Sequence, residues 1–322
     1  MDGRPSAGAF LSSGVRGPSG TVRARGPHGG AAAGRRALRG ARPRPQPVVG
    51  CAARPRAGGR GGGGVSRRRG GFLAVVLLLL LLAAACSAPE RRWQPKPGTA
   101  WQWQLDGKVD PGVDVPVYDI DGFENDSSTV RRLHRDGRKV ICYINAGAWE
   151  SFRPDHRDFP AAVRGRPNGW PGERWLDIRR LDVLRPLMAK RFDMCRARGY
   201  DAVEPDLLDA YLEDTGFPLT AGHQLAYNRM LARLAHERGL SVGLKNDLPQ
   251  IPELVDDFDF AVNEECAELN ECAALTPFIR AGKAVFHVEY ATPVGEFCAQ
   301  SRKLGLSSMR KRLDLGAWRR PC

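Results

Sequence analysis

The chain has 322 residues and a formal net charge of +13, and this charge is distributed very unevenly. Residues 1–92 contain 17 arginines, no lysine and only two acids, which gives +15. The rest of the chain contains 32 basic and 34 acidic residues, which gives −2. A nucleic-acid-binding protein needs a basic surface on its folded part. The composition therefore excludes nucleic acid as an expected partner, because the excess of arginine belongs to an N-terminal leader.

The leader has two parts. Residues 1–64 are rich in Gly, Arg, Ala and Pro with almost no aliphatic periodicity, so we expect them to be disordered. Residues 65–86 resemble a signal peptide, because Arg67–Arg69 precede an uninterrupted apolar run, Phe72–Ala85, that is short for a membrane span. Cys86 follows three alanines, as at a bacterial lipoprotein cleavage site. It is a candidate lipid anchor, although Ala83 stands where a leucine-like residue is usual.

A signal peptide normally begins near the N-terminus, whereas this one begins after residue 64. We therefore expect translation to start near Val65, which would make residues 1–64 a gene-model artefact; an unusually long basic leader is the alternative. Either way we expect a secreted or extracytoplasmic monomer, attached to a membrane only through a lipid on Cys86.

Export permits disulfide bonds. Six cysteines lie beyond the leader, and six cysteines allow fifteen pairings. The pairings that we expect are Cys266–Cys272, which would close a short loop, Cys298–Cys322 and Cys142–Cys195. A zinc site is disfavoured because the sequence has no CxxC motif and its histidines show no ligand spacing. We therefore predict no metal.

From Trp93 onward, short apolar runs alternate with segments of helical periodicity. Runs rich in Val, Ile, Ala and Phe are typical of strands covered on both faces. The predicted strands are residues 115–121, 139–145, 174–178, 200–206, 241–246, 258–265, 284–290 and 307–312. The predicted helices are residues 127–137, 181–199 and 220–239, each of which ends in glycine.

This alternation predicts an α/β fold, a single (β/α)8 TIM-type barrel over residues 114–322, with residues 87–113 as a linker or cap. A doubly wound open sheet is the alternative, but no glycine-rich phosphate loop follows any predicted strand. Barrels of this type carry their functional residues at the C-terminal ends of the strands, which we call the mouth.

Nearly every predicted strand ends in ionisable or amide groups, and acids outnumber bases. The residues that we expect to contact a substrate there are Asp119, Asp121, Tyr143, Glu204, Asp209, Lys245, Asn246, Asp247, Glu289 and Tyr290. Trp149, Trp170 and Trp175 are candidate stacking platforms, although tryptophan is more often a core residue. Glycoside hydrolysis needs two carboxylates, one to protonate the leaving oxygen and one to act as nucleophile or base. The fourth and sixth predicted strands are close enough on a barrel rim to supply such a pair.

Several motifs occur in the order and spacing typical of glycoside hydrolase family 114. They are YINAGAWESFRPD (143–155), GERWLDIR (172–179), GYDAVEPD (199–206), VGLKND (242–247), DFAVNEEC (259–266) and GKAVFHVEY (282–290). Residues 115–322 resemble this family throughout. The resemblance implies a secreted endo-α-1,4-polygalactosaminidase with a (β/α)8 barrel. By motif position the family's catalytic aspartate matches Asp206, as nucleophile or base, and its catalytic glutamate matches Glu264, as general acid/base.

The substrate that the resemblance implies is a galactosamine-rich polysaccharide of microbial biofilms. Such a chain is cationic when partly deacetylated, so an acidic mouth on a domain of charge −2 suits it electrostatically. We predict no cofactor, because two carboxylates and water suffice. The family commonly reads E-P-D-N after the fourth strand, and Leu207 replaces that asparagine here. Two alternatives therefore stay open: a non-catalytic glycan-binding lipoprotein on the same barrel, and a hydrolase of another amino-sugar polymer.

Overall fold

The structure is a computed structural model that describes residues 92–322. The expected disorder of residues 1–64, the signal peptide over residues 65–86 and the lipid anchor at Cys86 all lie outside the described residues. Within the described range, no helix is both long and apolar enough to cross a membrane.

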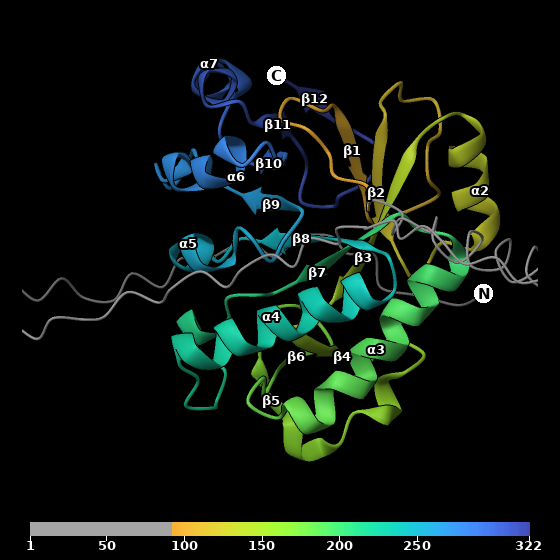
Figure 1. The fold of residues 1–322 in the computed structure, drawn as a ribbon, viewed down its shortest axis with the longest axis vertical. Coiled ribbons are helices and arrows are strands. Elements are labelled where there is room, and N and C mark those ends of the chain that lie inside the picture. Colours follow the sequence, from red (N-terminus) through yellow and green to blue (C-terminus); the bar gives the residue numbers. More distant parts are fainter. Residues whose placement is uncertain (1–91) are drawn as a thin grey trace, which may run out of the picture. The chain divides into compact units, whose positions relative to one another are not determined.

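Parallel strands form a sheet that curls into a barrel (Figure 1). In spatial order they are β1 (Trp101–Gln104), β2 (Val117–Asp121), β3 (Lys139–Asn145), β7 (Ala202–Asp206), β8 (Ser241–Lys245), β9 (Phe260–Glu264), β10 (Val285–Glu289) and β11 (Ser307–Arg310). A short strand, β12 (Arg320–Pro321), pairs antiparallel with β11. The Trp101 indole N–H donates to the Ser307 carbonyl at 2.8 Å, which joins β1 to β11. The predicted (β/α)8 fold is confirmed.

Helices follow most of these strands and cover the outside of the sheet (Figure 1). They are α2 (Ser127–Arg135), α3 (Leu181–Arg198), α4 (Ala221–Glu237), α5 (Ile251–Leu254), α6 (Thr276–Arg280) and α7 (Val294–Leu304). Short 3-10 helices are η1 (His156–Asp158), η2 (Ala161–Val163), η3 (Ala210–Leu212), η4 (Leu248–Gln250) and η5 (Cys272–Leu275). The three predicted helices are all present. Helix α3 ends as predicted at Gly199, which adopts the left-handed conformation at φ 93° that glycine tolerates best.

Two predictions about the sheet are wrong. The run at residues 174–178 is not a barrel strand: most of it belongs to β6 (Glu173–Leu176), which lies between β4 (Ala148–Glu150) and β5 (Arg164–Pro167) in a separate antiparallel sheet, the insertion sheet. The remaining barrel strand is β1, inside the segment predicted as linker or cap. Its sequence WQWQ contains no aliphatic run, so it does not look like a barrel strand. The two tryptophans fill the interior, and Gln102 and Gln104 donate to backbone carbonyls outside the barrel.

The barrel interior is apolar at the bottom and polar towards the mouth. Trp101 packs on Phe286 with ring centroids 4.7 Å apart, and Phe260 fills the space beside β8. A side chain at Gly243 would place its Cβ 2.4 Å from the Phe260 ring, so only glycine fits there. Above this layer the interior holds Asp119, Glu204 and Lys245, all almost completely buried. The charged groups of the barrel are therefore concentrated at and below the mouth.

All three predicted disulfides are present. They are Cys142–Cys195, which joins β3 to α3, Cys266–Cys272, which closes the loop after β9, and Cys298–Cys322, which joins α7 to the C-terminal segment. Three disulfides fit folding in an oxidising, extracytoplasmic compartment.

Candidate active site

Asp206 ends strand β7 and receives three hydrogen bonds. The Tyr143 hydroxyl donates to Oδ2 at 2.7 Å, and Lys245 Nζ and the Leu207 backbone N–H both donate to Oδ1 at 2.8 Å. Burial alone would raise the pKa of Asp206, but the Lys245 ammonium and these hydrogen bonds outweigh it and lower the pKa below its usual value. Asp206 is therefore ionised at neutral pH.

Glu264 ends strand β9 and faces the same cation. Its Oε2 lies 2.9 Å from Lys245 Nζ, and its Oε1 accepts a hydrogen bond from the Tyr290 hydroxyl. The Asn246 side chain fixes the backbone here, because its Oδ1 accepts from the Glu264 N–H at 3.0 Å. The Glu264 side chain is 25% exposed and that of Asp206 is 16% exposed, so both carboxylates are reachable from the mouth.

Lys245 bridges the two carboxylates and sets an upper limit on their separation. Its Nζ is 2.8 Å from an Asp206 oxygen and 2.9 Å from a Glu264 oxygen, so these oxygens are at most about 5.7 Å apart. Burial disfavours the Lys245 cation, yet the charges of Asp206, Glu264 and Glu204 raise its pKa well above its ordinary value. The pair therefore shares one permanent positive charge.

Asp119 and Glu204 lie beneath this pair and are fully buried, so the structure does not place them in contact with a substrate as predicted. Trp103 donates to one Glu204 oxygen at 3.1 Å, whereas no donor among the described residues reaches either Asp119 oxygen. A buried carboxylate without a donor is very unfavourable, so Asp119 must be neutral. Burial, then the charge of Glu204, raise the pKa of Asp119 well above its usual value, and the retained proton hydrogen-bonds to Glu204.

Two other residues predicted to contact a substrate are instead bound by neighbouring groups of the protein. Asp121 is held by Arg153, whose two terminal nitrogens lie 3.1 and 2.6 Å from its oxygens, and it also caps the turn that follows β2. Glu289 is fully buried and accepts from the Ala267 backbone N–H at 2.8 Å, with His287 Nε2 at 2.7 Å. Side chains alternate along a strand, so Glu289 points away from the interior that Val288 enters.

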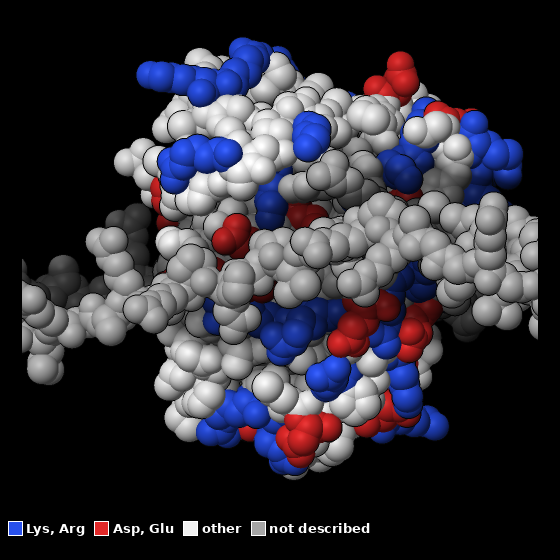
Figure 2. Space-filling model, in the orientation of Figure 1, with Lys and Arg blue, Asp and Glu red and all other residues white. Residues whose placement is uncertain are grey.

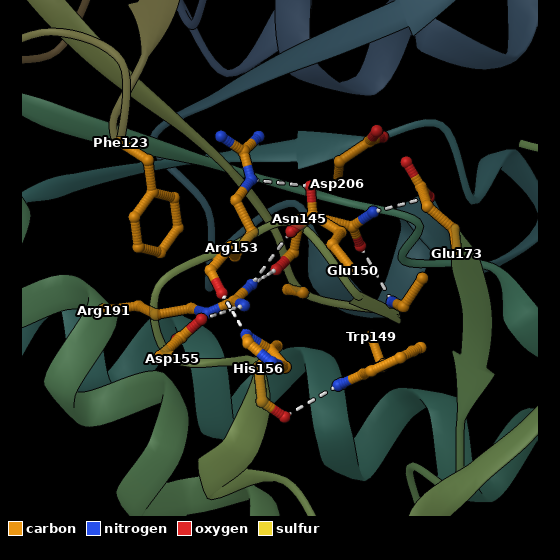
Figure 3. A network of polar contacts seen from close by, with 12 residues as sticks. Phe123, Asn145, Trp149, Glu150, Arg153, Asp155, His156, Glu173, Arg191 and Asp206 are labelled. Carbon is orange, nitrogen blue, oxygen red and sulfur yellow. Dashed lines mark hydrogen bonds and ion pairs between the residues drawn. The ribbon is translucent and has the colours of Figure 1, made fainter. Parts of the chain in front are cut away.

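A buried network of charges fixes the insertion sheet beside the mouth (Figure 3). Arg153 Nε donates to Glu150 at 2.8 Å, and Arg191 on α3 binds Asp155 through two nitrogens at 2.7 and 2.9 Å. Arg191 and Glu150 are each only 2% exposed. Each of these buried charges has an opposite charge beside it, so the network is a rigid support for the insertion sheet.

The insertion sheet adds a carboxylate that the sequence analysis did not select, Glu173 on β6. Its Oε2 accepts from the amides of Asn145 at 3.1 Å and Asn168 at 2.9 Å. Burial raises the pKa of Glu173 to about 7 against the hydrogen bond from Asn168, and the charges of Glu150 and Asp206 add to the rise. The only available signal was the first acid of the GERWLDIR motif, which was read as part of a barrel strand.

Asp209 and Asp247 complete the acidic surroundings of Asp206. Burial, then the charge of Asp206, raise the pKa of Asp209 to about 6. Burial, then the charge of Asp209, raise the pKa of Asp247 to about 8, although Asn228 donates to it at 2.9 Å. The predicted residues that the structure gathers at the mouth are Tyr143, Asp206, Asp209, Lys245, Asn246, Asp247, Glu264 and Tyr290. Of the three candidate platforms, Trp170 is exposed, Trp149 is half-buried and Trp175 is buried.

Residues 82–322 match the glycoside-hydrolase family GH114. The chain belongs to this family. Among solved structures, this GH114 member is similar to Ega3 of Aspergillus fumigatus in complex with galactosamine, with 39% sequence identity, coverage of 72% of this chain and 98% of that chain, and a TM-score of 0.68. The expected family and glycoside hydrolase activity are thereby confirmed.

Two further proteins are more distant. The glycoside hydrolase domain of PelA from Pseudomonas aeruginosa is 15% identical, with coverage of 69% of this chain and 96% of that chain and a TM-score of 0.52, which supports the fold alone. An uncharacterized protein of Deinococcus radiodurans is 28% identical over 203 residues, which are 56% of this chain and 64% of that protein. The matched part of the GH114 chain thus spans less than two thirds of that relative's length.

Proposed function

We propose that this GH114 protein is an exported, endo-acting hydrolase of α-1,4-linked galactosamine polymers, with Asp206 as nucleophile and Glu264 as general acid/base. The observation that carries the proposal is the pair of partly exposed carboxylates joined by one buried lysine. Asp206 is ionised, whereas Glu264 is the more exposed of the two and binds Lys245 through its own oxygen. That arrangement gives each acid a separate role.

The upper limit of about 5.7 Å between the two oxygens that Lys245 binds supports a retaining mechanism. Retaining glycosidases hold their carboxyl groups about 5–5.5 Å apart, and inverting ones about 6.5–9.5 Å. In the first step an Asp206 oxygen attacks the anomeric carbon while Glu264 gives its proton to the leaving glycosidic oxygen. In the second step Glu264 takes a proton from water, whose oxygen displaces Asp206 from the sugar.

Lys245 serves both steps. When Asp206 becomes an ester it loses its negative charge, and Glu264, having lost its proton, gains one. Because Lys245 Nζ is within 2.9 Å of both groups, the same cation stabilises the charge before and after the transfer without moving. In many enzymes such preorganised charge makes the largest contribution to stabilising the transition state.

The proposed substrate class rests on acidic side chains near Asp206 that have no cationic partner. Glu173 and Asp209 are both partly exposed and have no Lys, Arg or His nitrogen within 4 Å among residues 92–322, in contrast to Asp121 and Asp206. A chain of unacetylated galactosamine would bring the missing positive charge. The galactosamine bound to Ega3, a relative 39% identical, supports the same class. On the face drawn in Figure 2, basic and acidic side chains of the described residues are interspersed.

The test is to incubate purified protein with α-1,4-galactosamine polymer and, as a control, with chitosan. We expect oligosaccharides of many lengths from the galactosamine polymer, and NMR of the first product should show the α-anomer. Binding without shortening would favour the glycan-binding alternative, and cleavage of chitosan alone would favour another amino-sugar substrate. A β-anomer as first product would contradict a nucleophilic Asp206.

Export and anchoring form a separate part of the proposal and rest on the leader. We infer cleavage before Cys86 and attachment of a lipid to it. Mass spectrometry of the mature N-terminus, with a Cys86→Ala variant as control, tests this: a soluble wild-type protein that begins elsewhere would contradict it.

A further inference from the structure

We propose that Glu173 is a specificity-determining residue whose carboxylate binds the ammonium group of an unacetylated amino sugar beside Asp206. This inference rests on the proposed function, because it names the substituent that the same mouth recognises. It predicts a preference for deacetylated over N-acetylated polymer.

The geometry places Glu173 next to the reacting groups although it is not on a barrel strand. Asn145 ends β3 and is the register partner of Asp206 on β7. Its side-chain amide donates to Glu173 Oε2 at 3.1 Å, so Glu173 binds directly to the strand neighbour of Asp206. Figure 3 shows the carboxylates of Asp206 and Glu173 on the same side of Asn145. Glu173 also lies near enough to Asp206 for the charge of Asp206 to raise its pKa.

The carboxylate is held in a fixed orientation with one oxygen left for a ligand. Both amide donors, Asn145 and Asn168, bind the same oxygen, Oε2. Oε1 receives no hydrogen bond from residues 92–322, yet it is not among the buried unsatisfied atoms of that part of the chain. It is therefore accessible to solvent and to a donor on a ligand.

Charge distinguishes Glu173 from the other acids of the insertion sheet. Glu150, its cross-strand partner, is paired with Arg153 at 2.8 Å and Arg191 at 3.4 Å. No described Lys, Arg or His nitrogen lies within 4 Å of Glu173, and amides supply orientation without charge. A partly buried acid without a cation is unfavourable, and a bound ammonium relieves this. An acetamido group carries no charge, so it cannot compensate the charge of Glu173.

The groups that face Glu173 determine its pH behaviour. They are Tyr143 on β3, Glu150 on β4, Arg153 after β4 and Asp206 on β7. Burial first, and then the two acids, keep the pKa of Glu173 near about 7 in the free protein. A bound ammonium favours the ionised form, so the affinity for the cationic sugar should fall as the pH falls below 7.

The experiment compares wild type with Glu173→Gln on fully deacetylated and N-acetylated α-1,4-galactosamine polymers. The glutamine oxygen still accepts from both asparagines, so the fold is kept and only the charge is lost. Loss of one charge-assisted hydrogen bond predicts a KM on the deacetylated polymer at least about tenfold higher. KM on the acetylated polymer should be unchanged. Between pH 5 and 7 the wild-type KM on deacetylated polymer should fall with rising pH, and the variant's should fall less, because only Asp209, with a pKa of about 6, still titrates there.

Glu268→Gln, an exposed acid in the loop after β9, is the control for loss of one negative charge. Equal KM ratios and pH profiles for Glu173→Gln and Glu268→Gln would overturn the inference. NMR titration with galactosamine and N-acetylgalactosamine separates it from the proposed function. If wild type cleaves neither polymer but binds galactosamine more tightly than Glu173→Gln does, the function fails and the inference stands. If both proteins bind galactosamine equally, the inference fails whatever the activity.

Discussion

Replacement of Lys245 by methionine removes the one cation that three carboxylates share. Methionine keeps an unbranched side chain of similar length, so packing beside the Trp103 ring, 4.9 Å from Nζ, is largely retained. Lys245 is 2% exposed, and its Nζ lies 2.8 Å from Asp206, 2.9 Å from Glu264 and 3.5 Å from Glu204. Removal of one partner from a buried ion pair costs about 3–5 kcal/mol. We expect Lys245→Met to be destabilised by about that amount at pH 7.

The destabilisation should depend on pH in a definite direction. The pKa of Asp206 is lowered in the folded protein, so its charge contributes stability above its unfolded pKa and that stability is lost as the pH falls through the folded pKa. In Lys245→Met the folded pKa of Asp206 rises instead, and protonation then stabilises the variant. The stability difference from wild type should therefore shrink as the pH falls from 7 towards about 4.

Urea unfolding followed by tryptophan fluorescence at several pH values measures this difference, and Lys190→Met is the control. Lys190 pairs with Asp158 at 3.1 Å, but its side chain is 69% exposed, so we expect a change within about 0.5 kcal/mol. The acid limb of the activity profile should also move to higher pH in Lys245→Met. A Lys245→Met variant as stable as wild type at pH 7, with an unchanged acid limb, would refute the reasoning.

Further predictions concern single features of the barrel. Asp119→Asn should leave kcat and KM nearly unchanged and change stability by no more than about 1 kcal/mol, because the amide donates to Glu204 as the neutral acid does. A large rise in KM would instead indicate that Asp119 contacts the substrate. Leu207→Asn should raise stability by about 1 kcal/mol in urea unfolding, since Leu207 is strained at φ 61° and asparagine tolerates that conformation; a loss of stability would contradict this. Joint replacement of Cys298 and Cys322 by alanine should lower stability by about 2–4 kcal/mol, and an unchanged melting temperature would count against it.

The sequence predicts the strands whose aliphatic runs are buried on both faces, and these are most of the barrel. It fails at β1 because two tryptophans fill the interior there without any aliphatic residue. It fails at β6 because a short apolar run that follows an acid looks the same in an insertion as in a barrel strand. Strand type depends on pairing partners far away in the sequence, which local composition does not contain.

The site is predicted less completely than the fold. Asp206 and Glu264 came from the family resemblance, and Tyr143, Lys245 and Tyr290 from their places at strand ends. The sequence does not show that Glu289 points away from the barrel interior, because the inward-facing side of a strand depends on its register, and distance from the strand end does not fix it. The sequence does not show that Asp121 is paired with Arg153, because Arg153 follows β4, which belongs to the insertion sheet and does not pair with β2.

The measurement that tests the central claim most directly is release of reducing ends from α-1,4-galactosamine polymer by wild type, Asp206→Asn and Glu264→Gln. Glu265→Gln is the matched control, because it makes the same isosteric change one residue away. We predict that each of the first two variants loses at least about 100-fold in kcat, whereas Glu265→Gln retains most of its activity. Loss of less than that factor in either Asp206→Asn or Glu264→Gln, in a correctly folded protein, would contradict catalysis by this pair.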